Sequence, residues 1–168
     1  MTFDRRLGAA LLVIALWIPL FIAGMALHET LHAAAVLLLG SHPVLVLRPW
    51  PFMFLPITTT GIHVQPVPAF DPIRQALDNV MGPGLAAVVF AVAALNVPRG
   101  AVRTALMANV LGLVFFAVIE LADVVLDGRL EDGLLTAPEF NYGIPLLIAL
   151  LAAVRSAAGK TRPAILQA

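Results

Sequence analysis

The stretch LGAALLVIALWIPLFIAGMALHETLHAAAVLLL, residues 7–39, decides the fold. A helix of this length would measure about 50 Å, which is too long for one perpendicular membrane crossing and too short for two crossings with a turn. We therefore expect one long membrane helix, tilted or kinked at Pro19. A cleaved signal peptide is the rival interpretation, because Arg5 and Arg6 precede the apolar run, but no polar cleavage region interrupts it before Leu39.

The whole chain has the composition of an integral membrane protein. Of its 168 residues, 61% are hydrophobic and 12% are charged, whereas a soluble domain carries about 25% charged residues. Ten basic residues balance ten acidic ones, so we expect no nucleic acid partner, because a basic excess is needed to hold phosphates. The chain has no cysteine, which leaves histidine, aspartate and glutamate as metal ligands.

We expect an all-α membrane protein, a single domain over residues 1–168, with about four transmembrane helices. The predicted spans are residues 7–39, 80–97, 102–126 and 142–158. Basic residues lie before the first span, between the second and third, and toward the end of the fourth and beyond it, and they predict a multi-pass protein of the cell membrane with both termini in the cytoplasm. The residues behind this orientation are Arg5, Arg6, Arg99, Arg103, Arg155, Lys160 and Arg162.

The segment between the first two spans, residues 41–70, cannot be a helix. Seven of the thirteen prolines lie between Ser41 and Pro72. They separate two runs rich in β-branched residues, Val44–Leu47 and Ile57–Val64. These runs predict two short strands, forming a hairpin that lies against the helices, since unpaired strand edges cannot face lipid.

The chemistry is indicated by the motif His28-Glu29-Thr30-Leu31-His32 inside the first apolar stretch. Residues i and i+4 project from one face of a helix, so His28 and His32 can chelate one zinc ion. Zinc lowers the pKa of a water molecule to about 7, and Glu29 can take its proton and deliver it to a leaving amine. Ionisable residues within a membrane helix are costly and by default indicate function.

A catalytic zinc ion usually has three protein ligands, and the third span offers candidates for the third. Glu120, Asp123 and Asp127 are spaced to share one helical face. Counted from Arg6, His28 and His32 lie about 33 and 39 Å along their helix, and Asp127, counted from Arg103, lies at about 36 Å. This comparison ranks Asp127 first and Asp123 second as the third ligand, with Glu120 as a group that orients a histidine.

Three motifs in this order resemble the site-2 protease family of intramembrane zinc metalloproteases. They are His28-Glu29-Thr30-Leu31-His32, Gly82-Pro83-Gly84 and Leu126-Asp127-Gly128. The resemblance implies that the Gly-Pro motif opens a helix after a β-rich segment and that the Asp of the Leu-Asp-Gly motif is the third zinc ligand. It also implies cleavage of a peptide bond in or near the membrane, in a membrane-anchored peptide or protein substrate. The chain departs from the family beside both later motifs. After Gly82-Pro83-Gly84, Ala86 and Ala87 stand in place of an expected asparagine, and before Leu126 the chain has Ala122-Asp123-Val124-Val125 where the family often has Asn-Pro.

We therefore expect a membrane-embedded zinc metallopeptidase, with His28 and His32 as ligands, Asp127 or Asp123 as the third ligand and Glu29 as general base. One alternative is a catalytically degenerate relative that binds zinc and acts as a membrane interaction protein. Another is a small ion-coupled transporter in which Glu29, Glu120 and Asp123 relay ions, although no inverted repeat is evident.

Overall fold

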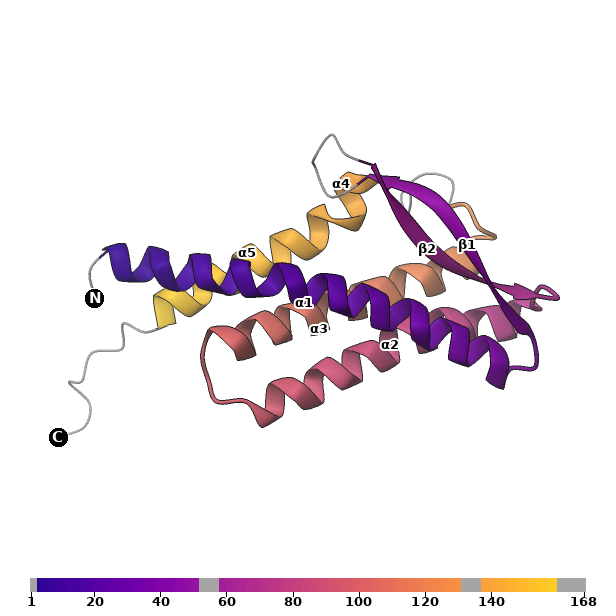
Figure 1. The fold of residues 1–168 in the computed structure, drawn as a ribbon, viewed down its shortest axis with the longest axis horizontal. Coiled ribbons are helices and arrows are strands. Elements are labelled where there is room, and N and C mark those ends of the chain that lie inside the picture. Colours follow the sequence, from indigo (N-terminus) through magenta and orange to yellow (C-terminus); the bar gives the residue numbers. More distant parts are fainter. Residues whose placement is uncertain (1–2, 52–57, 131–136, 160–168) are drawn as a thin grey trace.

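The computed structural model of the chain describes residues 3–51, 58–130 and 137–159. Four helices of 17 or more residues run roughly along the long axis of the molecule, and a two-stranded hairpin lies over one end (Figure 1). The predicted fold class is confirmed. Three helices, α1, α2 and α3, are long and apolar enough to cross a membrane.

Helix α1 runs from Phe3 to Leu38 and contains Pro19 without ending there. At 1.5 Å per residue it is about 54 Å long. It ends in a turn at Gly40, whose φ of 85° is open to glycine at little cost. The amide N–H of Ser41 donates to the carbonyl of Val36 at 3.0 Å and closes this end.

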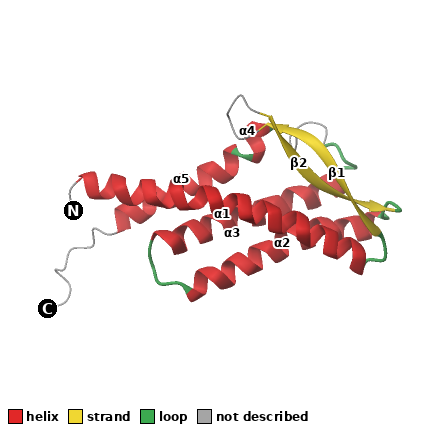
Figure 2. Ribbon diagram, in the orientation of Figure 1, coloured by secondary structure: helices red, strands yellow, loops and turns green. Residues whose placement is uncertain are grey.

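The predicted hairpin is present between α1 and α2 (Figure 2). Strands β1 (His42–Pro51) and β2 (Thr58–Val67) are antiparallel, with His42 opposite Val67 and Pro51 opposite Thr58. Both strands contact α1, and Val64 is buried. The hairpin therefore packs against α1, over the end of the bundle that lies away from the N-terminus (Figure 1).

Helix α2 (Pro72–Asn96) begins eight residues before the predicted span. Asp71 caps it by accepting hydrogen bonds from the backbone N–H groups of Ile73 and Arg74, both at 3.0 Å, and Pro72 occupies the first helical position. Because the helix starts here, Gly82 and Pro83 lie inside it rather than at its opening. The expectation drawn from the Gly-Pro motif was wrong on this point.

Helix α3 (Ala101–Val125) packs along α2 and also contacts α1 and α5. It ends just before Leu126-Asp127-Gly128, which forms a turn with φ of 54° at Asp127 and 76° at Gly128. The stripe of acidic residues predicted along this helix is therefore interrupted, because Asp127 lies beyond the last helical residue.

The fourth predicted span corresponds to α5 (Gly143–Gly159), preceded by the short helix α4 (Pro138–Asn141). With 17 residues, α5 is about 26 Å long, shorter than the other three. Its Ala149 and Ala153 pack with Trp17 and Phe21 of α1 in a buried cluster, where small residues let helices approach closely. The start of α1, the α2–α3 loop and the end of α5 gather at one end of the bundle (Figure 1).

Candidate metal centre

His28 and His32 lie one turn apart on α1, and both side chains point into the bundle. Their exposed fractions are 3% and 8%. The two Nε2 atoms are 2.8 Å apart, as expected for residues i and i+4 on one helical face. The histidine pair predicted from the motif is therefore brought together in the interior.

Glu120 of α3 faces this pair. Its Oε1 is 3.2 Å from Nε2 of His28 and its Oε2 is 3.2 Å from Nε2 of His32. One possible ligand atom from each of the three residues lies within 4.8 Å of the others. His28, His32 and Glu120, which we call the His-His-Glu cluster, could hold a metal ion between α1 and α3.

Asp78 of α2 supports the cluster from the other side of His32. Its Oδ1 lies 3.1 Å from Nδ1 of His32, and the aspartate is 2% exposed. A hydrogen bond there places the proton on Nδ1, which leaves the Nε2 lone pair of a neutral imidazole directed at the cluster. Histidines that bind metals usually have such a carboxylate partner.

The facing nitrogen and oxygen atoms of the cluster need a proton or a cation between them. With Nδ1 of His32 donating to Asp78, the neutral ring presents a lone pair to a carboxylate oxygen of Glu120 and to Nε2 of His28. Buried acceptors that face one another repel unless a proton or a cation lies between them. Two imidazole nitrogens and a carboxylate are suitable ligands for zinc.

Asn79, next to Asp78 in α2, connects the cluster to α3. Its Nδ2 donates to the backbone carbonyl of Glu120 at 2.9 Å, and its Oδ1 accepts from Nε2 of Gln75 at 2.6 Å. Side-chain bonds of this kind fix the axial position of one helix against another. Asn79 therefore helps to hold Glu120 at the level of the histidines.

Gly82, one turn after Asp78, lies directly against the ring of His32. A Cβ atom built on Gly82 would collide with Cδ2, Nε2 and Cε1 of that imidazole. The small residue allows the backbone of α2 to pass next to the ring. In this fold, the glycine of the Gly82-Pro83 motif therefore makes room for the ring of His32.

Glu29 follows His28 in the chain, and its side chain is half-buried. Its Oε2 is buried and has no hydrogen-bond partner among the residues that the structure describes. An unpartnered buried carboxylate oxygen is costly, and a catalytic role is one explanation for such a group.

The other predicted ligands, Asp123 and Asp127, are not part of the cluster. Asp123 is buried, but its Oδ1 accepts from the backbone N–H of Leu130 at 2.8 Å and so fixes the turn after α3. Asp127 is exposed in that turn. The structure thus leaves both aspartates outside the cluster and brings Glu120, ranked below them, next to the histidines.

Asp127 was ranked first on the assumption that Arg6 and Arg103 lie at one level along the bundle. Helix α1 instead extends well beyond the start of α3 (Figure 1), so Arg103 lies deeper in the bundle than Arg6. Glu120 lies about 26 Å from Arg103 and His28 about 33 Å from Arg6, and this offset allows the two residues to meet.

Asp78 and Asn79 were not predicted as site residues, because the predicted span began at Val80 and left both outside the helix. A signal was present in Asp71-Pro72, a helix cap followed by proline, which starts the helix early enough to include them. From that start, Asp78 and Gly82 are i and i+4 and share the face that contacts His32.

Comparison of the chain with family models, with curated proteins and with solved structures found no match.

Proposed function

We propose that the chain is a membrane-embedded zinc metallopeptidase. The observation that carries this proposal is the convergence of Nε2 of His28, Nε2 of His32 and the carboxylate of Glu120 at one buried point. Two of these residues belong to a motif that zinc peptidases use. The third replaces the aspartate that the resemblance to site-2 proteases implies, and two histidines with one glutamate are an established ligand set for hydrolytic zinc.

Zinc at this cluster would supply a Lewis acid for a peptide carbonyl and would activate a water molecule. Three protein ligands suit that role because a catalytic ion keeps one coordination position open. The helices exclude bulk water from the cluster, since both histidines are almost fully buried, and burial strengthens the interactions of every charge there.

Glu29 is assigned as the general base. Its unpartnered Oε2 would accept a proton from the attacking water and return it to the departing amide nitrogen. Asp78 would keep the proton of His32 on Nδ1, so that Nε2 stays available as a ligand. Asn79 would keep Glu120 at the same depth as the two histidines.

The expected substrate is a membrane-anchored peptide or protein that presents an unwound segment, because the carbonyls of an intact helix are hydrogen-bonded. The hairpin packs against α1, over the end of the bundle toward which the second half of α1 runs (Figure 1). Each of its two strands has one edge with no strand partner in the described part of the chain. An extended substrate could pair with such an edge.

An open apolar pocket of about 500 Å³ lies between the start of α2 and the end of α3. Leu77 and Leu121, which line it, directly neighbour Asp78 and Glu120 in sequence. The pocket is therefore at the depth of the cluster and could accept an apolar side chain of the substrate.

The test combines metal analysis with proteolysis of the full chain purified without chelators. The wild type should contain one zinc ion and should cleave a peptide whose transmembrane segment is easily unwound. Glu29→Gln should retain the zinc and lose cleavage, because the amide cannot accept the proton. His63→Ala serves as the matched control, because this histidine is exposed on β2 and lies outside the cluster.

Each outcome distinguishes the proposal from its alternatives. A wild-type protein without zinc would refute the metal site, and cleavage by fully loaded Glu29→Gln would refute the role of Glu29. Zinc binding with no cleavage of any membrane substrate would favour the degenerate interaction protein. Cation flux in proteoliposomes without zinc dependence would favour the transporter.

A further inference from the structure

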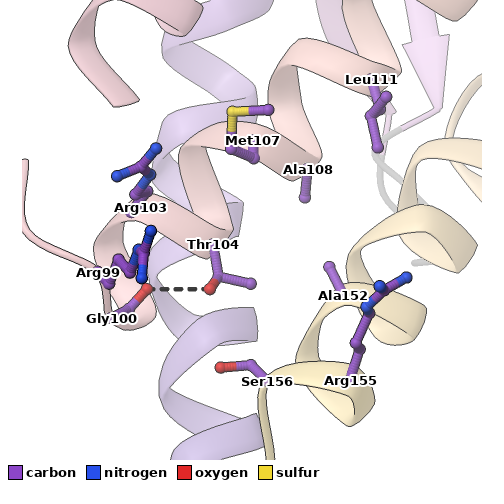
Figure 3. Close-up of a pocket in the computed structure, with 10 residues that line it drawn as sticks. All are labelled: Arg99, Gly100, Arg103, Thr104, Met107, Ala108, Leu111, Ala152, Arg155 and Ser156. Atoms are coloured by element: carbon purple, nitrogen blue, oxygen red, sulfur yellow. Dashed lines mark hydrogen bonds between the residues drawn. The ribbon is translucent and has the colours of Figure 1, made fainter. Parts of the chain in front are cut away.

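A second pocket lies at the end of the bundle opposite the hairpin, between α3 and α5 (Figure 3). Its volume is about 340 Å³ and it opens to the surface. Arg99 lies just before α3 and Arg103 in its first turn, and Arg155 lies across the pocket on α5. Nothing in the proposed peptidase chemistry uses these residues, since Arg103 is 17 residues, or about 26 Å, from Glu120 along the helix.

Three arginines line the pocket, Arg99 and Arg103 on one side and Arg155 on the other (Figure 3). Within residues 3–51, 58–130 and 137–159, no acidic residue lines the pocket and none of the three guanidinium groups is paired with a carboxylate. Helix α3 begins at Ala101, and its N-cap residue Gly100 has no side chain to cap it, so the first backbone N–H groups of the helix add to the positive potential. The hydroxyl groups of Thr104 and Ser156 also line the pocket.

The rest of the pocket lining is apolar and continues along the side of the bundle. Met107 and Leu111, on the same face of α3 as Arg103 and Thr104, are 40% and 53% exposed. Because α3 is long and apolar enough to cross a membrane, this exposed surface would meet acyl chains.

We propose that this pocket binds the phosphate headgroup of an anionic phospholipid, with one acyl chain lying along Met107 and Leu111. Guanidinium groups bind phosphate through paired hydrogen bonds. Basic pockets between membrane helices at the cytoplasmic level are typical sites for anionic headgroups. The pocket joins both features, because three arginines and an apolar surface line it together near the end of a candidate membrane span.

The experiment uses the full chain purified in a neutral detergent. Native mass spectrometry would measure the binding of phosphatidylglycerol, phosphatidylcholine and inorganic phosphate separately. We expect one saturable phosphatidylglycerol site, much weaker binding of phosphatidylcholine, and no displacement of the lipid by inorganic phosphate in excess. Each arginine replaced should weaken phosphatidylglycerol binding about fivefold, so Arg103→Gln with Arg155→Gln should weaken it about 25-fold.

The matched control is Arg5→Gln with Arg6→Gln, which removes the same charge near the start of α1, at the same end of the bundle, but outside the pocket. Its phosphatidylglycerol affinity should stay within about twofold of the wild type. If the double pocket variant does not purify as a single species, Arg103→Gln and Arg155→Gln alone provide the measurement. The proposal is wrong if the control loses as much affinity as the pocket variants, if both lipids bind equally, or if inorganic phosphate displaces the lipid.

Discussion

The imidazole of His32 occupies the space that a side chain at residue 82 would need. A Cβ on Gly82 would collide with three atoms of the ring, including Nε2, the nitrogen that faces Glu120. On its opposite side the ring is held by Asp78, four residues earlier in the same helix. Helix α2 therefore contacts His32 twice and determines the orientation of its ring, although α2 contributes no residue to the His-His-Glu cluster.

This contact predicts the effect of a single methyl group. Gly82→Ala should displace the ring of His32 and weaken zinc binding about 10- to 100-fold, the range expected when the support of a ligand is lost. Gly84→Ala is the matched control, because its Cβ would meet only Val80 of its own helix, at 3.8 Å. Zinc affinity measured by competition with a chelator checks both. Unchanged affinity in Gly82→Ala would show that the ring does not need its present position.

Removing the charge of Asp78 should have a comparable effect through the proton of His32. Asp78→Asn keeps a hydrogen-bond acceptor but loses the carboxylate that favours the Nδ1–H form, so zinc affinity should again fall about 10- to 100-fold. Asp78→Ala should also lower stability by about 1–3 kcal/mol, because a buried N–H loses its partner. Titration calorimetry and thermal unfolding measure the two effects. Equal zinc affinity in wild type and Asp78→Asn would contradict the role of this carboxylate.

Asp71, just before α2, predicts a pH-dependent contribution to stability. The backbone N–H of Arg74 donates to its carboxylate and, with that of Ile73, lowers the pKa of Asp71 below its usual value of 3.8. A carboxyl whose folded pKa is lowered stabilises the fold above its unfolded pKa, and this contribution is lost as the pH falls through the folded pKa. Asp71→Asn keeps a capping oxygen without the charge. Its melting temperature should lie below the wild type at neutral pH and should converge with it in acid, whereas a constant difference would contradict the assignment.

The helices and the hairpin were predictable because their signals are local. An apolar run in which Glu29 is the one acidic or basic residue, histidines aside, predicts α1, and β-branched runs between prolines predict the strands. The start of α2 was misplaced because apolarity was weighed above the cap at Asp71 and Pro72. A helix can begin with polar turns when a cap satisfies its first N–H groups, and here those turns carry Asp78 and Asn79.

The histidine pair was also predictable, because the spacing of His28 and His32 is a property of one helix. The third member of the cluster was not, since the axial offset between α1 and α3 is a property of tertiary packing. The residues around Glu120 and Asp127 in the sequence do not indicate how far α1 extends beyond α3. The end of α3 at Val125 further separates Asp127 from the helical face on which its spacing had placed it.

The identity of the third ligand gives the sharpest test of the structure against the resemblance. Glu120→Gln should lower zinc affinity more than about a hundredfold, because loss of a ligand exceeds the 10- to 100-fold effect of its supporting partners. Asp127→Asn should leave zinc binding unchanged, since this side chain is exposed in the turn after α3. Asp123→Asn should also retain zinc, because an amide oxygen can still accept from the N–H of Leu130. Zinc content of the three purified variants decides the matter, since all three remove one carboxylate charge. Loss of zinc in Asp127→Asn with retention in Glu120→Gln would restore the aspartate of the Leu-Asp-Gly motif as the ligand and would require α3 to continue beyond Val125 in the metal-bound protein.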